Sequence, residues 1–267
     1  MTDVIDLNAH ILPDMDDGSP DMATSLEMAR VAVDDGIVVM ACTPLLMPGM
    51  FAASLTDITE RVTRFQNRLN EDDILLDVVV GSTAHHRPDF LHALGSGQIT
   101  TINNSRYVLF DAPHMVPPAR LEEMMARLLD AGYVPILAKP ERLKWIEAHY
   151  ELIEAMVAAG VWLQVTAGSL TGHNGRQALY WAEKLLDTGM VHILATDSHN
   201  LVSRPPVLSE AYEFARAAVG PDEALNLVST RPVNILDDLP TDHSPAVAFS
   251  RSRTEEPKWL WPRLRVV

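Results

Sequence analysis

The sequence predicts a single α/β domain whose parallel strands form a barrel or a wound sheet. Short apolar runs alternate along the chain with stretches whose apolar residues recur at helical spacing. Glycines stand between predicted helices and strands, where a left-handed residue ends a helix. The length of 267 residues suits one barrel-sized domain with a large buried core.

Seven runs are predicted to be buried strands because each is short and largely apolar. In chain order they are residues 4–7, 37–41, 75–80, 107–110, 134–137, 161–165 and 192–195. Five amphipathic stretches between them are predicted to be helices, at residues 25–33, 58–69, 121–129, 152–158 and 178–186. The glycines expected to end a helix before a strand are Gly36, Gly132, Gly160 and Gly189.

The charge balance narrows the classes of partner. A formal net charge of −15 repels nucleic-acid backbones and anionic membranes, so no nucleic-acid partner is expected. An anionic substrate would need a local cluster of arginine or lysine. The single cysteine, Cys42, leaves no pair for an internal disulfide. Without a recognisable secretory signal or spanning apolar segment, we expect a cytoplasmic protein with no membrane insertion.

The last part of the chain differs in composition from the rest. We expect a barrel domain over residues 1–240 and a C-terminal tail over residues 241–267. The tail is rich in arginine and contains Trp259 and Trp261, and tryptophan favours interfaces. Residues 255–265 are therefore expected to pack on the barrel or on a partner, and a disordered chain end is the alternative. The oligomeric state stays open.

Polar side chains gather where the predicted strands end. In a parallel barrel these ends meet at one face, where active sites are built. The sequence therefore predicts a functional site at this face. The side chains concerned are His10 with Asp14, Asp16 and Asp17, then Thr83, Asp111, Lys139 with Arg142, Ser169, and Asp197 with His199.

The residues after the first strand also have a structural interpretation. Asp14, Asp16 and Asp17 could cap the helix that follows, since aspartate is a favoured N-cap residue. His10 could be a hydrogen-bonded core histidine. The sequence alone leaves these alternatives open.

The later candidates differ in how specific they are. His85 and His86 fall in a predicted loop and are expected to form an exposed surface pair. Arg142 could form a structural ion pair, or it could bind an anion. Asp197 and His199 are separated by one residue at a strand end, a spacing that is typical of metal ligands.

Five segments resemble the motifs of one family, in the same order. The stretch I-D-L-N-A-H-I-L-P-D-M-D-D-G at 5–18 resembles D-x-H-x-H-I-L-P-x-x-D-D-G, and A-C-T-P at 41–44 resembles A-T-P-H. Y-V-P-I-L-A-K-P-E-R at 133–142 resembles G-Y-x-P-V-L-A-H-P-E-R, and A-G-S-L-T-G at 167–172 resembles N-A-G-S-L-x-G. A-T-D-S-H-N at 195–200, with R-P at 204–205, resembles A-S-D-A-H-N followed by R-P. Over about residues 3–237 the chain resembles the PHP-type (polymerase and histidinol phosphatase) bacterial tyrosine phosphatases of capsule and exopolysaccharide systems.

The resemblance implies a distorted (β/α)7, TIM-like barrel of the PHP type with up to three metals, often manganese, at the strand ends. It implies hydrolysis of phosphotyrosine on a partner protein, typically the tyrosine kinase that controls polysaccharide export. By the family pattern the metal ligands are His10, Asp17, Asp111, Asp197 and His199. Arg142, Arg204 and His199 are implied to be catalytic, and Arg142, Arg204 and Lys139 are implied to bind phosphate.

Four positions depart from the family pattern. Asn8, Leu45 and Lys139 stand where the motifs have histidine, and Thr83 stands where a bridging glutamate is expected. Leucine cannot bind a metal, and Lys139 places a positive charge where a third cation would lie. We therefore expect fewer metals than the family pattern implies, or none.

Three hypotheses about function remain open. The chain could be a phosphatase with a reduced metal centre. It could be a pseudophosphatase that binds a phosphorylated or anionic partner through Arg142 and Arg204 without hydrolysis. It could also be a barrel kept for its surface while the site decays.

Overall fold

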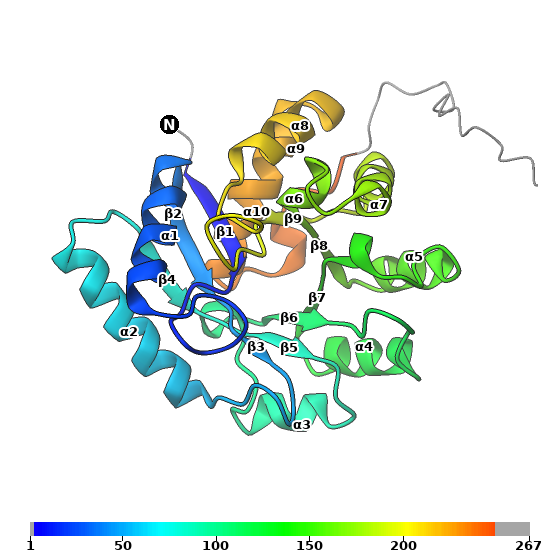
Figure 1. Ribbon diagram of the computed structural model, residues 1–267. Helices are drawn as coiled ribbons and strands as arrows, with labels where there is room; N and C mark the ends of the chain where they lie inside the picture. The colour runs from blue at the N-terminus through cyan, green and yellow to red at the C-terminus, as the bar shows by residue number, and fades with distance from the viewer. Residues whose placement is uncertain (1–2, 249–267) are drawn as a thin grey trace, which may run out of the picture.

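The computed structural model describes residues 3–248, which form a curled parallel sheet surrounded by helices (Figure 1). All pairings between the strands are parallel, in the orders β1-β2-β4 and β3-β5-β6-β7-β8-β9. The strands are β1 Val4–Ala9, β2 Ile37–Cys42, β3 Leu45–Leu46, β4 Asp77–Val80, β5 Thr83–His85, β6 Tyr107–Asp111, β7 Val134–Ala138, β8 Trp162–Thr166 and β9 Ile193–Ala195.

The two strand sets belong to one sheet. After a two-residue break β2 continues into β3, and β4 likewise continues into β5. Gly81 N donates to Cys42 O at 3.1 Å and Thr83 N donates to Pro44 O at 3.1 Å, so both lines of chain stay paired through the breaks. Pro44 has no N–H to donate to a ladder, which is one reason for the interruption.

The sheet closes between its last strand and its first. Ala9 and Ser198 form a parallel bridge, Asp197 N donates to Asn8 O at 2.9 Å, and His10 N donates to Ser198 O at 2.9 Å. When β2–β3 and β4–β5 are each counted as one interrupted strand, the described residues form a barrel of seven strands. The predicted distorted (β/α)7 barrel is thus confirmed, as are all seven predicted strands. β3 and β5 were not predicted because two or three residues are too few to show an apolar run.

Helices cover the outside of the sheet (Figure 1). The five predicted helices are present, and the shorter helices and those beyond residue 200 were not predicted. Gly36, Gly132, Gly160 and Gly189 all have positive φ, as expected for residues that end helices. The helices are α1 Met22–Asp34, α2 Leu55–Glu71, α3 Phe90–Gly95, α4 Leu121–Asp130, α5 Tyr150–Ala158, α6 Ala167–Leu170, α7 Arg176–Asp187, α8 Ser209–Val219, α9 Pro221–Leu225 and α10 Arg231–Leu236.

The chain after α10 is attached to the barrel as far as it is described. The buried Arg231 guanidinium pairs with Glu223 at 2.8 Å and donates to Pro245 O and Ala246 O at 3.0 and 3.1 Å. The expected packing of residues 255–265, with Trp259 and Trp261, lies outside the described residues. Among residues 3–248, none of the helices has the length and apolar character needed to cross a membrane.

His192, immediately before β9, is held in its neutral form. Its ring stacks on Trp162 with 4.9 Å between centroids, and its Nδ1 accepts a hydrogen bond from Leu163 N at 3.1 Å. An accepting Nδ1 carries no proton. Burial and the positive charge of Arg231 lower the pKa of His192 to about 3.

This environment predicts a pH dependence of stability. Below about pH 6.5 the unfolded chain protonates His192 while the folded protein excludes that proton. The free energy of unfolding therefore decreases as the pH is lowered from roughly 6.5 to 3. This group contributes a loss of up to about 1.4 kcal/mol per pH unit. His192→Gln keeps an acceptor for Leu163 N but does not titrate. Urea unfolding at about pH 7, 6 and 5 should show a shallower loss for the variant; equal slopes for both proteins would contradict this assignment.

Candidate functional site

The buried carboxylate of Asp197 lies at the centre of the polar cluster at the C-terminal strand ends. Its Oδ2 accepts hydrogen bonds from Arg142 Nη1 at 2.8 Å and Arg204 Nη2 at 2.6 Å. Its Oδ1 lies 3.3 Å from Lys139 Nζ and 3.5 Å from His10 Nε2. Burial acts to raise the pKa of Asp197, but Lys139, His10 and Arg204 hold that pKa well below its usual range. The carboxylate is therefore charged at neutral pH.

Two of the basic side chains come from the end of β7. Lys139 follows the strand directly, in a left-handed conformation with φ of 48°. Arg142 ends the short turn Pro140–Arg142, whose middle residue, Glu141, is fully buried. The Glu141 carboxylate accepts hydrogen bonds from Thr166 N at 3.1 Å and Ser169 Oγ at 2.7 Å. These bonds fix the turn against β8, so the backbone of Arg142 has a defined position.

The third basic side chain comes from the loop after β9. Asn200 Oδ1 accepts hydrogen bonds from the backbone N–H groups of Val202, Ser203 and Arg204, at 3.0, 2.8 and 3.2 Å. His199 N donates to Arg204 O at 2.9 Å and closes the loop. The loop is compact, and Arg204 starts from a fixed point close to Asp197.

These cations outnumber the carboxylates that they face. Lys139, Arg142 and Arg204 surround Asp197, and Lys139 Nζ also lies 3.4 Å from Asp111 Oδ1. We call these five residues the basic cup. Its excess of positive charge stands out in a protein with a net charge of −15. Guanidinium groups match the oxygen geometry of phosphate, so the cup is suited to a phosphate-like anion.

A candidate metal site lies beside the cup. His10, Asp17 and His199 each offer one ligand atom, and these atoms lie within 4.8 Å of one another. His199 Nε2 is 3.6 Å from Asp17 Oδ1, and the two imidazole centroids are 3.8 Å apart. Ligand atoms that each lie about 2.1 Å from one ion are roughly 3 to 4 Å from each other. The three side chains are therefore close enough to bind one divalent ion after small side-chain shifts.

Neighbouring groups orient both imidazoles toward that point. His10 Nδ1 lies 2.5 Å from Asp16 Oδ2, which also accepts a hydrogen bond from Leu45 N at 2.6 Å. His199 Nδ1 donates to the backbone oxygen of Asp197 at 2.8 Å. Both rings thus present Nε2, and His10 Nε2 makes no hydrogen bond within the part of the chain that is described. A carboxylate or carbonyl behind the ring is the usual support of a metal-binding histidine.

The protonation states agree with this use. Burial lowers the pKa of His199, so its imidazole is neutral at pH 7. The adjacent His199 ring, together with the positive charges of His10 and Arg204, holds the pKa of Asp17 below its usual range, which keeps the carboxylate charged. Burial acts to lower the pKa of His10, but Asp16 and Asp197 outweigh it and raise the pKa to about 9. A metal must therefore displace a proton from His10.

The ion-pair geometry does not fit a further cation next to Asp111. Its Oδ1 lies 3.4 Å from Lys139 Nζ, and its Oδ2 lies 2.8 Å from His85 Nδ1. The Lys139 ammonium would repel a metal at this position. The assignment of Asp111 as a metal ligand stays a prediction that this ion pair does not support.

A neutral hydrogen-bond network contains two of the substituted ligand positions, Asn8 and Thr83. Asn8 Nδ2 donates to Gln164 Oε1 at 2.9 Å, and Asn8 Oδ1 accepts from Thr43 Oγ1 at 3.0 Å and Thr83 Oγ1 at 3.1 Å. All four side chains are buried. Hydroxyl and amide groups that already bond to one another are poor ligands for a cation. Within residues 3–248, one group of side chains, His10, Asp17 and His199, lies close enough together to hold an ion.

The structure also decides between the alternatives left open by the sequence. Helix α1 is capped by Asp21, so the suggestion that Asp14, Asp16 and Asp17 cap it is wrong. Sequence reasoning missed Asp16 as the support of His10, although its spacing of six residues from His10 was a possible signal.

The histidines after the third predicted strand were also misplaced. His85 is not an exposed surface residue, because it lies on β5 and contacts Asp111. His86 is partly buried, with its ring edge-on to Phe110. The alternation of short strands β3 and β5, which the sequence did not reveal, places His85 at the site.

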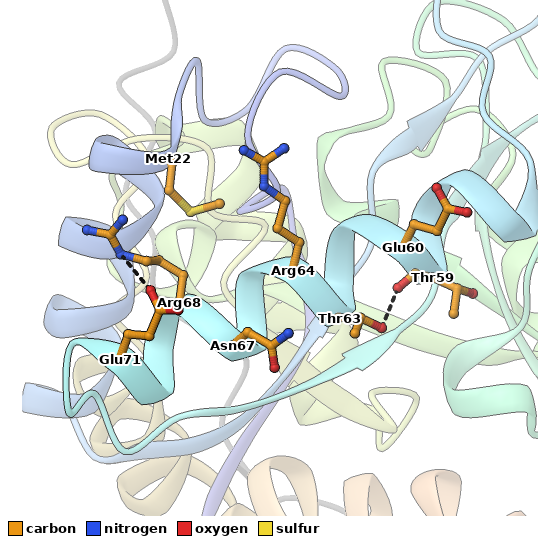
Figure 2. Close-up of a pocket in the computed structure, with 8 residues that line it drawn as sticks. All are labelled: Met22, Thr59, Glu60, Thr63, Arg64, Asn67, Arg68 and Glu71. Atoms are coloured by element: carbon orange, nitrogen blue, oxygen red, sulfur yellow. Dashed lines mark hydrogen bonds and ion pairs between the residues drawn. The ribbon is translucent and has the colours of Figure 1, made fainter.

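A surface groove of about 550 Å³ lies elsewhere, between α1 and α2 (Figure 2). Polar and charged side chains of α2, such as Arg64, Asn67 and Glu71, line it, with Met22 as the one apolar contributor among the lining residues. None of the lining residues belongs to a strand end. The groove therefore plays no part in the candidate site.

Comparison with known proteins places the chain in a family. The model of the family described as "Capsular polysaccharide synthesis, CpsB/CapC" matches residues 4–237. The chain is 33% identical to the tyrosine-protein phosphatase YwqE of Bacillus subtilis over 75% of this chain and 79% of that protein. It is 25% identical to the tyrosine-protein phosphatase CpsB of Streptococcus pneumoniae over 88% of this chain and 99% of that protein.

Solved structures agree with this placement. A crystal structure from the pair YwqE of Bacillus subtilis and CpsB of Streptococcus pneumoniae, described as unique metal-dependent tyrosine phosphatases, matches with a TM-score of 0.86. The match is 30% identical in sequence and covers 92% of this chain and 100% of the other. The inactive dihydroorotase-like domain of a Chaetomium thermophilum CAD-like protein, at 10% identity and a TM-score of 0.52, is similar in fold alone.

We predict that Asp16→Asn weakens metal binding about 10- to 100-fold, because it removes the charge that orients His10 and favours its ligand role. Titration calorimetry with Mn²⁺ measures this without any activity assay. Asp14→Asn is the matched control, since Asp14 lies in the same loop with an exposed side chain. Equal affinities of the two variants would contradict the supporting role of Asp16.

Proposed function

The chain belongs to the CpsB/CapC capsular polysaccharide synthesis family, and on this premise we propose that it is a metal-dependent protein-tyrosine phosphatase. One observation carries the proposal. A cup of three cations lies directly beside two imidazoles and a carboxylate that face a common point. Such a site can hold a phosphate monoester and a divalent ion next to each other.

The roles follow from the geometry. Arg142 and Arg204, which donate to Asp197, would turn these N–H groups toward the phosphate oxygens of the substrate, and Lys139 would neutralise a further oxygen. His10, Asp17 and His199 would hold the ion, with Asp197 Oδ1 close to His10 Nε2. A divalent ion, for which we propose manganese, supplies Lewis-acid chemistry and activates water.

The substituted ligands set the expected strength of catalysis. Lys139 supplies a fixed positive charge but cannot activate water as a metal does. Phosphate monoesters are among the slowest esters to hydrolyse without a catalyst, so activity depends on the one ion that the site fits. We propose phosphotyrosine on a protein, such as a bacterial tyrosine kinase, as the substrate.

The decisive experiment combines metal analysis with an assay. We expect about one divalent ion per chain and Mn²⁺-dependent hydrolysis of p-nitrophenyl phosphate and phosphotyrosine peptides. Phosphopeptide binding without hydrolysis at any Mn²⁺ concentration would instead make the chain a pseudophosphatase. Three tightly held ions per chain would overturn the single-ion site.

We predict that Arg142→Ala weakens the binding of vanadate or phosphate by about tenfold or more, because it removes a charged donor to the anion. The loss should appear with and without metal. Arg64→Ala removes an exposed arginine of α2 and serves as the control. Inhibition constants and calorimetry provide the measurement; an unchanged anion affinity in Arg142→Ala would contradict the role of the cup.

We also predict that Lys139→His combined with Thr83→Glu raises the metal content from about one to about two ions per chain. The double change restores two ligands and removes the charge that repels a cation next to Asp111. Lys144→His, an exposed position in the next turn, is the control. Elemental analysis after dialysis measures the outcome, and an unchanged metal content would show that Lys139 does not exclude a second ion.

A further inference from the structure

An apolar hollow of about 460 Å³ lies next to the strand-end face. Seven of its eleven lining residues are apolar, among them Leu46, Met47, Phe51, Ala53 and Ile99; the other four are Ser54, Asp57, Arg87 and Gln98. The turn between Met47 and Phe51, closed by hydrogen bonds at 2.9 Å, forms one wall and carries Met50 at its tip with 68% of its surface exposed. Hollows of this size with apolar walls are typical of ligand sites.

Two interrupted strands, β2–β3 and β4–β5, connect the hollow to the candidate site. Leu45 N bonds Asp16, the support of His10, and the next residue, Leu46, lines the hollow. On the neighbouring strand, β5, His85 contacts Asp111. Arg87, two residues further on, lines the hollow. Since successive strand residues are about 3.3 Å apart, the hollow begins within a few residues of the basic cup.

Other exposed apolar side chains lie on loops at the same face. Met115 and Val116, on the loop after β6, are 72% and 63% exposed. Val202, at the tip of the loop that Asn200 braces, is 91% exposed. These three side chains add exposed apolar surface to the loops at the strand-end face.

The groove between α1 and α2 offers a contrast (Figure 2). It is of similar size, but charged and polar side chains line it, including Glu60, Arg64 and Arg68. It has no connection through its lining residues to the strand ends. A mainly apolar lining and a position next to the strand ends therefore coincide at the hollow beside β3.

We propose that this hollow binds an aliphatic or aromatic side chain of a polypeptide whose phosphotyrosine occupies the basic cup. The inference rests on the proposed function and adds to it a preference for the residues that flank the phosphotyrosine. A small phosphate ester reaches the cup alone, whereas a polypeptide extends past it over the apolar walls. The hollow thus separates protein substrates from small ones.

The test uses the full chain with Mn²⁺ and three substrates. Two phosphotyrosine peptides differ in having leucine and phenylalanine or serine beside the phosphotyrosine, and p-nitrophenyl phosphate is the third. We expect a kcat/KM for the apolar peptide roughly tenfold above that for the polar one. Met50→Glu and Ala52→Glu, both at exposed positions of the 47–53 segment, should abolish most of this preference. Activity toward p-nitrophenyl phosphate should be unchanged, since neither side chain belongs to the cup.

Leu75→Glu is the matched control, because Leu75 is 83% exposed in the loop before β4, at the other end of the barrel. Equal kcat/KM for both peptides, or the same effect from Leu75→Glu, would overturn the proposal. If no aryl phosphate is hydrolysed, the proposed function fails, and fluorescence anisotropy of the labelled peptides still tests the hollow. Tighter binding of the apolar peptide that Met50→Glu removes would support it, and equal binding would sink it.

Discussion

The buried charge of Asp197 is the constraint on which the rest of the site depends. A carboxylate out of contact with water is costly unless cations and hydrogen bonds compensate it. Here four side chains converge on this one group: Lys139 just after β7, Arg142 from the following turn, Arg204 from the loop after β9 and His10 just after β1. Its own backbone N–H bonds β1, where the barrel closes. Closure of the barrel and assembly of the cup therefore depend on the same residue, Asp197.

The replaced ligand positions show a consistent chemistry. A glutamate at position 83 without a metal would leave an uncompensated buried carboxylate next to Asn8, whereas Thr83 donates to Asn8, which in turn donates to Gln164. Lys139 likewise neutralises Asp111 as well as Asp197. Changing one of these residues alone would leave a buried group unpaired, which costs about 1 to 3 kcal/mol. The interior is a rebuilt polar network, and the contacts give no sign of simple decay.

The sequence predicted the fold well and the site in part, for physical reasons. Long apolar strands and helix-ending glycines are local signals, so the main strands of the barrel were predictable. β3 and β5 are too short to produce such a signal, and without them His85 could not be placed beside Asp111. Asp16 could not be told from a capping residue, because the difference depends on how the loop folds back onto His10. Motif order identified the candidate residues, but the pairing of Lys139 and Asp111 needed coordinates.

The same contacts link the two kinds of ligand that the site suits. While the arginines donate to Asp197 Oδ2, they compensate its charge, so an anion must compete with this carboxylate for them. A cation held by His10 and His199 lies close to Asp197 Oδ1, since His10 Nε2 is 3.5 Å from that oxygen, and so compensates the carboxylate from the other side. The arginines can then turn to phosphate at a smaller electrostatic cost. By linkage each ligand strengthens the binding of the other by the same factor. Lys139, which contacts Asp197 in either case, keeps part of this compensation in place and lets the cup accept an anion even before a metal binds.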